Sequence, residues 1–157
     1  MSFKLIKNGI SKNNMMCEIE IIFEERRKRI KAMVDSGNLL RDPISKVPVV
    51  VVEKEELKDV LPEEIVNNVG KILKGETVEN AVISKYISKF KVIPFSSIGT
   101  ESGILLGVKV DGIKVCTEDE KVKPKSGIIG IYDKPLCRKG EYKGLIGLEF
   151  VEKEMAI

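Results

Sequence analysis

Four consecutive valines, Val49 to Val52, follow directly after Pro48 and limit the folds open to this chain more than any other segment. A run so rich in β-branched residues predicts a strand that is buried on both of its faces. Pro48 fits such a strand only at its start, because proline cannot donate a backbone hydrogen bond to the ladder. The sequence therefore favours a fold built around a β-sheet.

Several other segments alternate between apolar and polar residues, as strands do. Residues 17–23 and 26–35 are predicted to form two strands, with a solvated turn and strand face in the charged run 24–29. The remaining strands are expected at 92–96, 103–110, 113–116, 127–131 and 143–151. A hairpin tip is predicted at 97–102, a second hairpin turn at Asp111-Gly112, and a polar loop at 117–125.

The middle of the chain has helical periodicity instead. Leu57 and Leu61 have helical spacing, and residues 65–73 predict an amphipathic helix that begins at Pro62 and ends at Gly75. A shorter helix is expected over residues 79–89, and the apolar stripes of these helices are expected to pack against the sheet. The predicted fold is mainly β with inserted helices, in a single domain over residues 1–157.

Asp35, Ser36 and Gly37 lie where the second predicted strand ends. Glycine allows a tight turn there, because it adopts positive φ at little cost. A strand that ends on Asp-Ser-Gly is how an aspartic protease presents one half of its catalytic pair. Such a tripeptide also occurs by chance in about one of every 25 chains of this length. An ordinary polar turn is therefore the alternative.

Composition excludes several kinds of chemistry. The chain has no histidine, which rules out Ser-His-Asp and Cys-His nucleophiles and a histidine-ligated zinc. Its formal net charge of +3 is too small to indicate nucleic-acid or membrane binding. Cys17, Cys116 and Cys137 are widely spaced and indicate reduced thiols. No apolar run approaches the roughly 20 residues that cross a bilayer, so the chain as given is expected to be soluble.

Two carboxylates that share a proton across a water molecule can hydrolyse an amide without metal, histidine or cofactor. The aspartates at 42, 59, 111, 119 and 133 do not follow an apolar strand and precede Ser/Thr-Gly as Asp35 does. The enzyme hypothesis therefore predicts that a second copy of the chain supplies the other carboxylate. That arrangement requires a two-fold homodimer with Asp35 near its axis.

Two further segments follow in an order that suits such an enzyme. The hairpin containing Ser97, Ile98, Gly99 and Gly103 is predicted to be a flap over the substrate. Leu145-Ile146-Gly147 is predicted to pack behind the catalytic loop. Each segment alone has an ordinary interpretation, as a surface hairpin and as the end of a core strand.

This order resembles that of retroviral-type aspartic proteases, which work as dimers. Four stretches resemble one group in particular, the sporulation sigma-E factor processing peptidases: Asp35–Pro43, Pro48–Val52, Val92–Gly99 and Gly103–Gly107. The resemblance covers about residues 15–151. It implies half of a retropepsin-like closed β-barrel, with two copies forming one active site.

The resemblance implies further expectations about function. Asp35 would be the catalytic residue, Ser36 would bond across the dimer axis and Gly37 would shape the loop. The full-length protein would carry an N-terminal membrane region, with this domain at the cytosolic face on the mother-cell side of the septum. The substrate would be a pro-sigma factor, and a secreted forespore protein would be the activator.

Two alternatives remain open from the sequence. The first is a protease-like fold that only binds or scaffolds a partner, with Asp35 as a turn residue. The second is a DNA-binding regulator that uses Arg26 to Arg29, which would require DNA affinity that depends strongly on salt.

Overall fold

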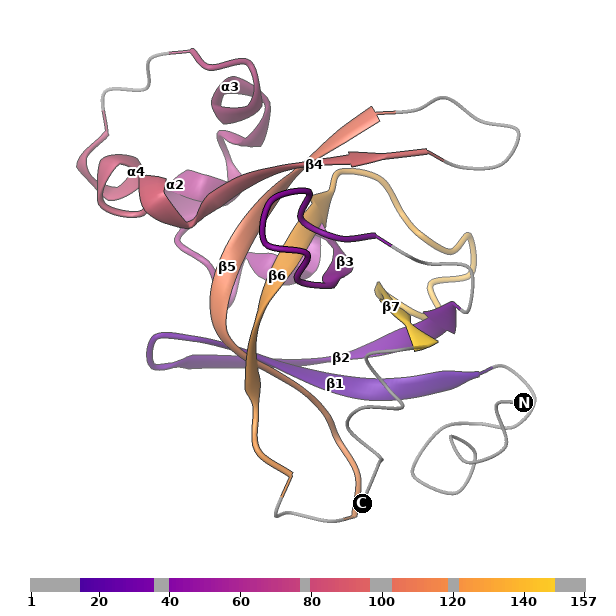
Figure 1. The fold of residues 1–157 in the computed structure, drawn as a ribbon. Helices are drawn as coiled ribbons and strands as arrows, with labels where there is room; N and C mark the ends of the chain where they lie inside the picture. The colour runs from indigo at the N-terminus through magenta and orange to yellow at the C-terminus, as the bar shows by residue number, and fades with distance from the viewer. Residues whose placement is uncertain (1–14, 36–39, 77–79, 97–102, 119–121, 149–157) are drawn as a thin grey trace.

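The computed structural model describes residues 15–35, 40–76, 80–96, 103–118 and 122–148 (Figure 1). The strands within these ranges are β1 (Met16–Phe23), β2 (Arg26–Asp35), β3 (Val49–Glu53), β4 (Phe90–Phe95), β5 (Gly103–Val115), β6 (Lys125–Tyr132) and β7 (Gly144–Gly147). The helical segments are η1 (Lys54–Leu57), α2 (Glu63–Val66), α3 (Val69–Leu73), α4 (Ala81–Lys85) and η2 (Ile87–Lys89). None of the described helices is long and apolar enough to cross a membrane.

Six of the strands close into a β-barrel. The strand order is β1-β2-β7-β3-β6-β5-β4, and an additional antiparallel pairing of β1 with β5 closes the first six. β4 extends the sheet beyond β5, and the short helices gather at one end of the molecule (Figure 1). The predicted class, mainly β with inserted helices, is confirmed.

β3 lies near the centre of the sheet and is buried on both faces, as its valines predict. Val50 and Val52 belong to the core inside the barrel, which we call the inner core. Val49 and Val51 face a second apolar group on the outside of the barrel, the outer cluster. The outer cluster consists of Val49, Val51, Ile93, Leu105 and Ile128, packed against Leu40, Val47, Phe95, Tyr132, Leu136 and Leu145.

The predicted hairpin turn at Asp111-Gly112 is wrong. β5 continues through both residues to Val115, with a bulge between Val110 and Ile113. The Asp111 carboxylate instead accepts a hydrogen bond from the backbone N–H of Glu24 in the β1–β2 turn. Gly112 is needed for close approach, since a Cβ there would lie 2.6 Å from Cβ of Pro124. A bulge and a turn favour the same residues. Here the pairing of β5 with β1 and β6 keeps the strand continuous, so that these residues form a bulge.

The predicted helix over residues 65–73 is interrupted. α2 ends at Val66 and α3 begins at Val69, because Asn68 leaves the helical ladder with φ −124°. Its side-chain amide donates a 2.7 Å hydrogen bond to the carbonyl of Glu64, which competes with helix continuation. The predicted stop is confirmed, since Gly75 has φ +71°. The side chains of Ile65 and Val66 pack into the inner core, as expected.

The charged run 24–29 forms the β1–β2 turn and the start of β2, as predicted. Arg27 and Arg29 both contact Glu20, at 3.3 and 3.4 Å, and Lys28 contacts Asp59 at 2.6 Å. These intrachain ion pairs engage three of the four basic side chains in the run. This pairing disfavours the DNA-binding alternative.

Candidate active site

Asp35 is the last residue of β2 and is half-buried. Side chains alternate along this strand, so that Ala32 and Val34 enter the inner core. Asp35 therefore lies on the outer face of the barrel together with Met33. The predicted strand ending on a carboxylate is present, and its carboxylate is directed away from the inner core.

β7 places the predicted Leu145-Ile146-Gly147 segment beside the end of β2. The two strands are parallel, and Ile146 pairs with Val34 while Gly147 pairs with Asp35. Ile146 is fully buried in the inner core, whereas Leu145 packs against the outer cluster. The structure thus joins the strand-terminal aspartate to the apolar-apolar-glycine segment through backbone pairing.

The predicted flap begins as a hairpin of β4 and β5, with Phe95 paired to Gly103. A Cβ on Gly103 would lie 2.9 Å from the Phe95 ring, so the glycine makes room for that ring. Phe95 packs against the outer cluster, and so does Leu145 near Asp35. The base of the hairpin and the end of β7 therefore contribute to one apolar surface. The other predicted site residues, Ser36, Gly37, Ser97, Ile98 and Gly99, lie outside the described residues.

Sequence reasoning missed Tyr142, which precedes β7. Its hydroxyl donates a 3.4 Å hydrogen bond to the carbonyl of Leu136. Burial raises the pKa of Tyr142, and the charges of Cys137 and Asp35 raise it further. The phenol is therefore neutral at physiological pH, and the charge of Asp35 acts on it electrostatically. A lone tyrosine after a mostly charged stretch, residues 138–141, carries no sequence signal for this position.

The three thiols have different environments. Burial raises the pKa of Cys17 to about 12, which makes that thiol inert. Burial also raises the pKa of Cys116. The pKa of Cys137 is lowered, mainly by a hydrogen bond from the backbone N–H of Glu141. Cys137, close to Tyr142, is consequently the thiol with the most thiolate character. Within the described residues, no group of three or more Cys, Asp or Glu side chains could hold a metal ion.

Asp42 is 2% exposed and closes the loop that brings Leu40 and Val47 onto the outer cluster. Its carboxylate accepts a 2.6 Å hydrogen bond from the Ser45 hydroxyl and a 3.3 Å bond from the Ile44 N–H. The Ser45 bond is the main reason that the pKa of Asp42 lies below its ordinary value. The structure thus uses Asp42 to hold a turn, consistent with its exclusion as the second carboxylate.

Asp42→Ala is expected to lower the free energy of unfolding near neutral pH by about 1–3 kcal/mol, since the Ile44 and Ser45 N–H groups and the Ser45 hydroxyl lose their charged acceptor. Because the folded state depresses this pKa, the carboxylate stabilises the fold above its ordinary value of 3.8. That stabilisation is lost as pH falls through the lower folded pKa. Urea unfolding of both proteins between about pH 3 and 7 should show the difference shrinking in acid. A difference independent of pH would contradict this account.

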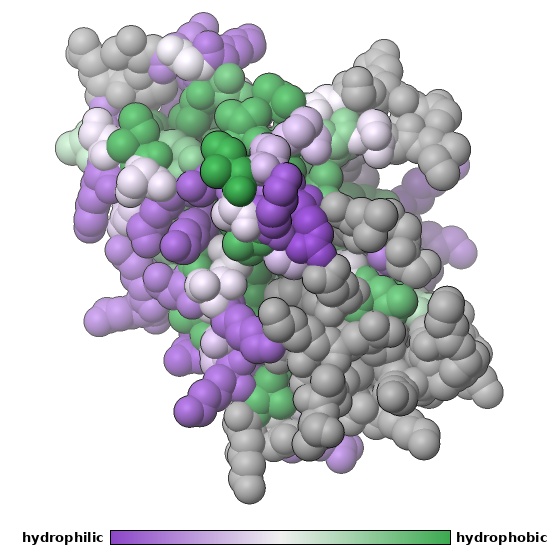
Figure 2. All heavy atoms as spheres, viewed as in Figure 1, coloured by the Kyte–Doolittle hydropathy of each residue, from purple (hydrophilic) through white to green (hydrophobic). Residues whose placement is uncertain are grey.

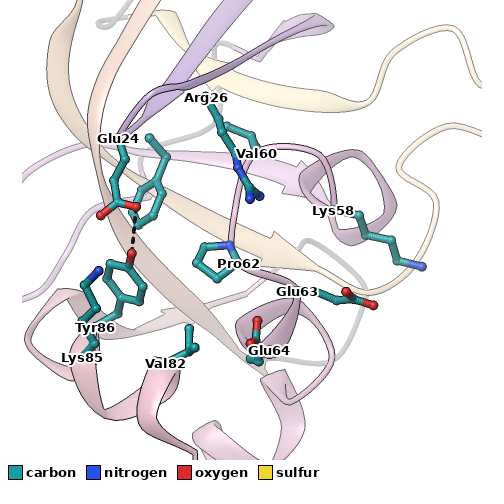
Figure 3. A pocket seen from close by; sticks show the side chains of 11 residues that line it. Glu24, Arg26, Lys58, Val60, Pro62, Glu63, Glu64, Val82, Lys85 and Tyr86 are labelled. Atoms are coloured by element: carbon teal, nitrogen blue, oxygen red, sulfur yellow. Dashed lines mark hydrogen bonds between the residues drawn. The ribbon is translucent and has the colours of Figure 1, made fainter.

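A pocket of about 380 Å³ lies between the β1–β2 turn and the helices, away from the Asp35 end of β2 (Figure 3). Its apolar lining comes from Phe23, Val60, Pro62, Val82 and Tyr86. The Tyr86 hydroxyl donates a 2.8 Å hydrogen bond to Glu24, which closes one side. Three cationic and three anionic residues line the pocket, so its charge favours no ligand of either sign.

Apolar groups also reach the surface elsewhere. Figure 2 shows them near the top centre of the view, where Figure 1 places β4 and the helices. The exposed large apolar side chains in the described ranges are Ile44, Ile87, Val92 and Ile104. Val92 and Ile104 belong to the β4–β5 hairpin, whose opposite face packs on the outer cluster.

Comparison with known proteins identifies the family. Residues 1–149 match the model of the Peptidase U4 family, described as Sporulation factor SpoIIGA. The chain belongs to this family. It is 28% identical over 136 residues to the sporulation sigma-E factor-processing peptidase of Priestia megaterium. It is 27% identical over 120 residues to the protein of the same name from Bacillus subtilis strain 168.

These two relatives are longer than the chain. The matches cover 85% and 74% of this chain but only 43% and 38% of the respective relatives. No solved structure matches the chain significantly. Membership therefore places this barrel within a peptidase family whose named members process a sporulation sigma factor, as the sequence resemblance predicted.

Proposed function

We propose that this chain is the protease domain of an aspartic endopeptidase that removes the pro-segment of a sporulation sigma factor. The observation that carries the proposal is the parallel pairing of β2 and β7, which sets Asp35 beside Gly147 at the rim of the outer cluster. Membership in a peptidase family and the names of the relatives support the substrate class. Because this chain contains no histidine, it offers no imidazole general base, and this favours a mechanism that uses carboxylates.

In the proposed mechanism, one Asp35 carboxylate removes a proton from a water molecule that attacks the scissile carbonyl. The second, protonated Asp35 donates a hydrogen bond to the carbonyl oxygen as the tetrahedral intermediate forms. Two like charges at hydrogen-bond distance cannot both ionise, so the pair titrates as a unit with one raised pKa. The half-exposed apolar side chains of the outer cluster would receive the side chains of an extended substrate.

The second carboxylate is proposed to come from a second copy of the chain, related by a two-fold axis near Asp35. The Ser36 hydroxyl would bond across that axis, and the hairpin that includes Gly103 would cover the substrate. We further propose that a membrane region of the longer protein holds two copies together at the cytosolic face. A secreted forespore protein would then act as the activator.

Mixing two forms of the protein tests the shared site. When wild-type and Asp35→Asn chains are co-expressed in equal amounts, at the same total level as the wild-type control, mixed dimers lack one carboxylate. Cleavage of the sigma-factor precursor should then fall to about a quarter of the wild-type rate, because random pairing leaves that fraction of intact dimers. Immunoblots of precursor and product measure the rate. Half the wild-type rate would show that each chain acts alone and would contradict the shared site.

A further inference from the structure

One buried glutamate holds both ends of residues 136–143, which lie in the connection from β6 to β7 and are here called the 136–143 segment. Glu53, the last residue of β3, accepts a 2.9 Å hydrogen bond from the N–H of Leu136 through Oε2. Its Oε1 lies 3.6 Å from Nζ of Lys143, and its own backbone N–H donates to the Lys143 carbonyl at 3.0 Å. Three contacts from one residue therefore fasten a segment of eight residues to the barrel.

The environment of Glu53 is unusual for a carboxylate. The residue is 6% exposed and follows the fully buried Val52 at the end of a strand that is otherwise all valine. Burying a charge is costly unless the charge is paired and hydrogen-bonded. Leu136 and Lys143 provide this pairing. An apolar residue could pack at this position, but it could not hold the segment in the same way.

The 136–143 segment carries Tyr142 to the face of the barrel on which Asp35 lies. The Lys143 N–H donates a 2.8 Å hydrogen bond to the carbonyl of Lys31 in β2, the strand that ends at Asp35. Leu136, which accepts the Tyr142 hydroxyl, packs against the same outer cluster as Leu145. The electrostatic effect of Asp35 on Tyr142 agrees with this placement.

We propose that Glu53 is a positioning residue of the Asp35 site: it fixes the 136–143 segment and so holds Tyr142 as one wall of the substrate-binding surface at the outer cluster. This inference rests on the proposed peptidase function. Without the Glu53 carboxylate, the Leu136 N–H and the Lys143 ammonium lose their shared partner. The backbone pairing of β3 with β6 and β7 remains, so the barrel persists while the wall moves.

Glu53→Gln tests the inference, because the amide keeps the size of the side chain, removes the charge that faces Lys143 and leaves the Leu136 N–H only a neutral, weaker acceptor. We expect precursor cleavage to fall about tenfold, since small displacements in an active site cost one to two orders of magnitude in rate. Glu55→Gln is the matched control: Glu55 is exposed and pairs with Lys58 on the surface. The control should cleave at the wild-type rate and unfold at the wild-type temperature.

Cys137 supplies a readout that does not depend on activity. Its pKa is held low by N–H groups of residues 139–141, which requires an ordered segment. In Glu53→Gln, the pH profile of Cys137 alkylation, followed by peptide mass spectrometry, should shift upward toward the ordinary thiol value of 9.0. Lys143→Met should produce a smaller shift, because it leaves the Leu136 N–H its charged carboxylate acceptor. It also serves as the test variant if Glu53→Gln fails to fold.

The outcomes separate two kinds of failure. An unchanged Cys137 profile in Glu53→Gln would overturn the positioning role, whatever happens to cleavage. A shifted profile with cleavage at the wild-type rate would show that the segment is held but does not serve the site, which also overturns the inference. Cleavage by an Asp35→Asn protein would instead overturn the proposed function. Loss of cleavage together with a shifted profile supports the inference.

Discussion

Replacing Asp35 with asparagine is expected to reduce cleavage of the sigma-factor precursor by at least about 10²–10⁴-fold, the contribution of a positioned general acid or base. Asparagine has nearly the same shape but cannot take a proton from water. Because Asp35 ends β2 on the outer face of the barrel, the exchange leaves the inner core unchanged. Co-expression of precursor, activator and the full natural polypeptide in a cell lacking its own peptidase measures the effect.

Asp59→Asn is the matched control for this experiment. Its side chain is 66% exposed and contacts Lys28, and a surface ion pair of this kind contributes little to stability. The control variant should process the precursor as the wild type does. Processing by Asp35→Asn at the wild-type rate would refute the aspartic mechanism. The chain would then be better explained as a non-catalytic binding domain.

Truncating Ile146 is expected to produce the largest loss of stability. Ile146→Ala should lower the free energy of unfolding by about 2–5 kcal/mol, because it leaves a cavity where a fully buried side chain filled the inner core. The loss would occur in β7, a strand of four residues that joins β2 to β3. Equilibrium unfolding in urea, monitored by circular dichroism, measures the change.

Ile146→Val provides the graded comparison, with an expected loss of about 0.5–1.5 kcal/mol. If Ile146 acts only through packing, cleavage at a temperature where both variants are folded should stay near the wild-type rate. A loss below about 1 kcal/mol for Ile146→Ala would mean that the neighbouring side chains close the cavity. In that case β7 would be less important for holding the end of β2 than its position suggests.

Local patterns were sufficient to predict most of the strands. The spacing of apolar residues indicates which side chains are buried. It was therefore enough to predict β3 from its valines, and β1 and β2 from their alternation. Asp111-Gly112 was misassigned because a turn and a bulge select the same residues. The break at Asn68 was missed because one side-chain amide outweighed an otherwise continuous helical stripe.

The candidate site was predictable only in part. Asp35 and Leu145–Gly147 belong to recognisable local patterns, and the structure pairs them across more than a hundred residues of chain. Glu53 and Tyr142 have no such signal, since their positions depend on contacts with Leu136 and Lys143 that form only after the barrel closes. Closure of β1 onto β5 likewise depends on partners that are far apart in the sequence.

The position of Pro94 has a consequence for behaviour at high protein concentration. Among the described strands, β4 lies at the end of the sheet order, so one of its sides has no neighbouring strand in the sheet. Proline has no N–H, and position 94 therefore offers no donor to an incoming strand. The β4 edge is therefore a poor template for an added strand, which disfavours strand-by-strand growth of a fibre.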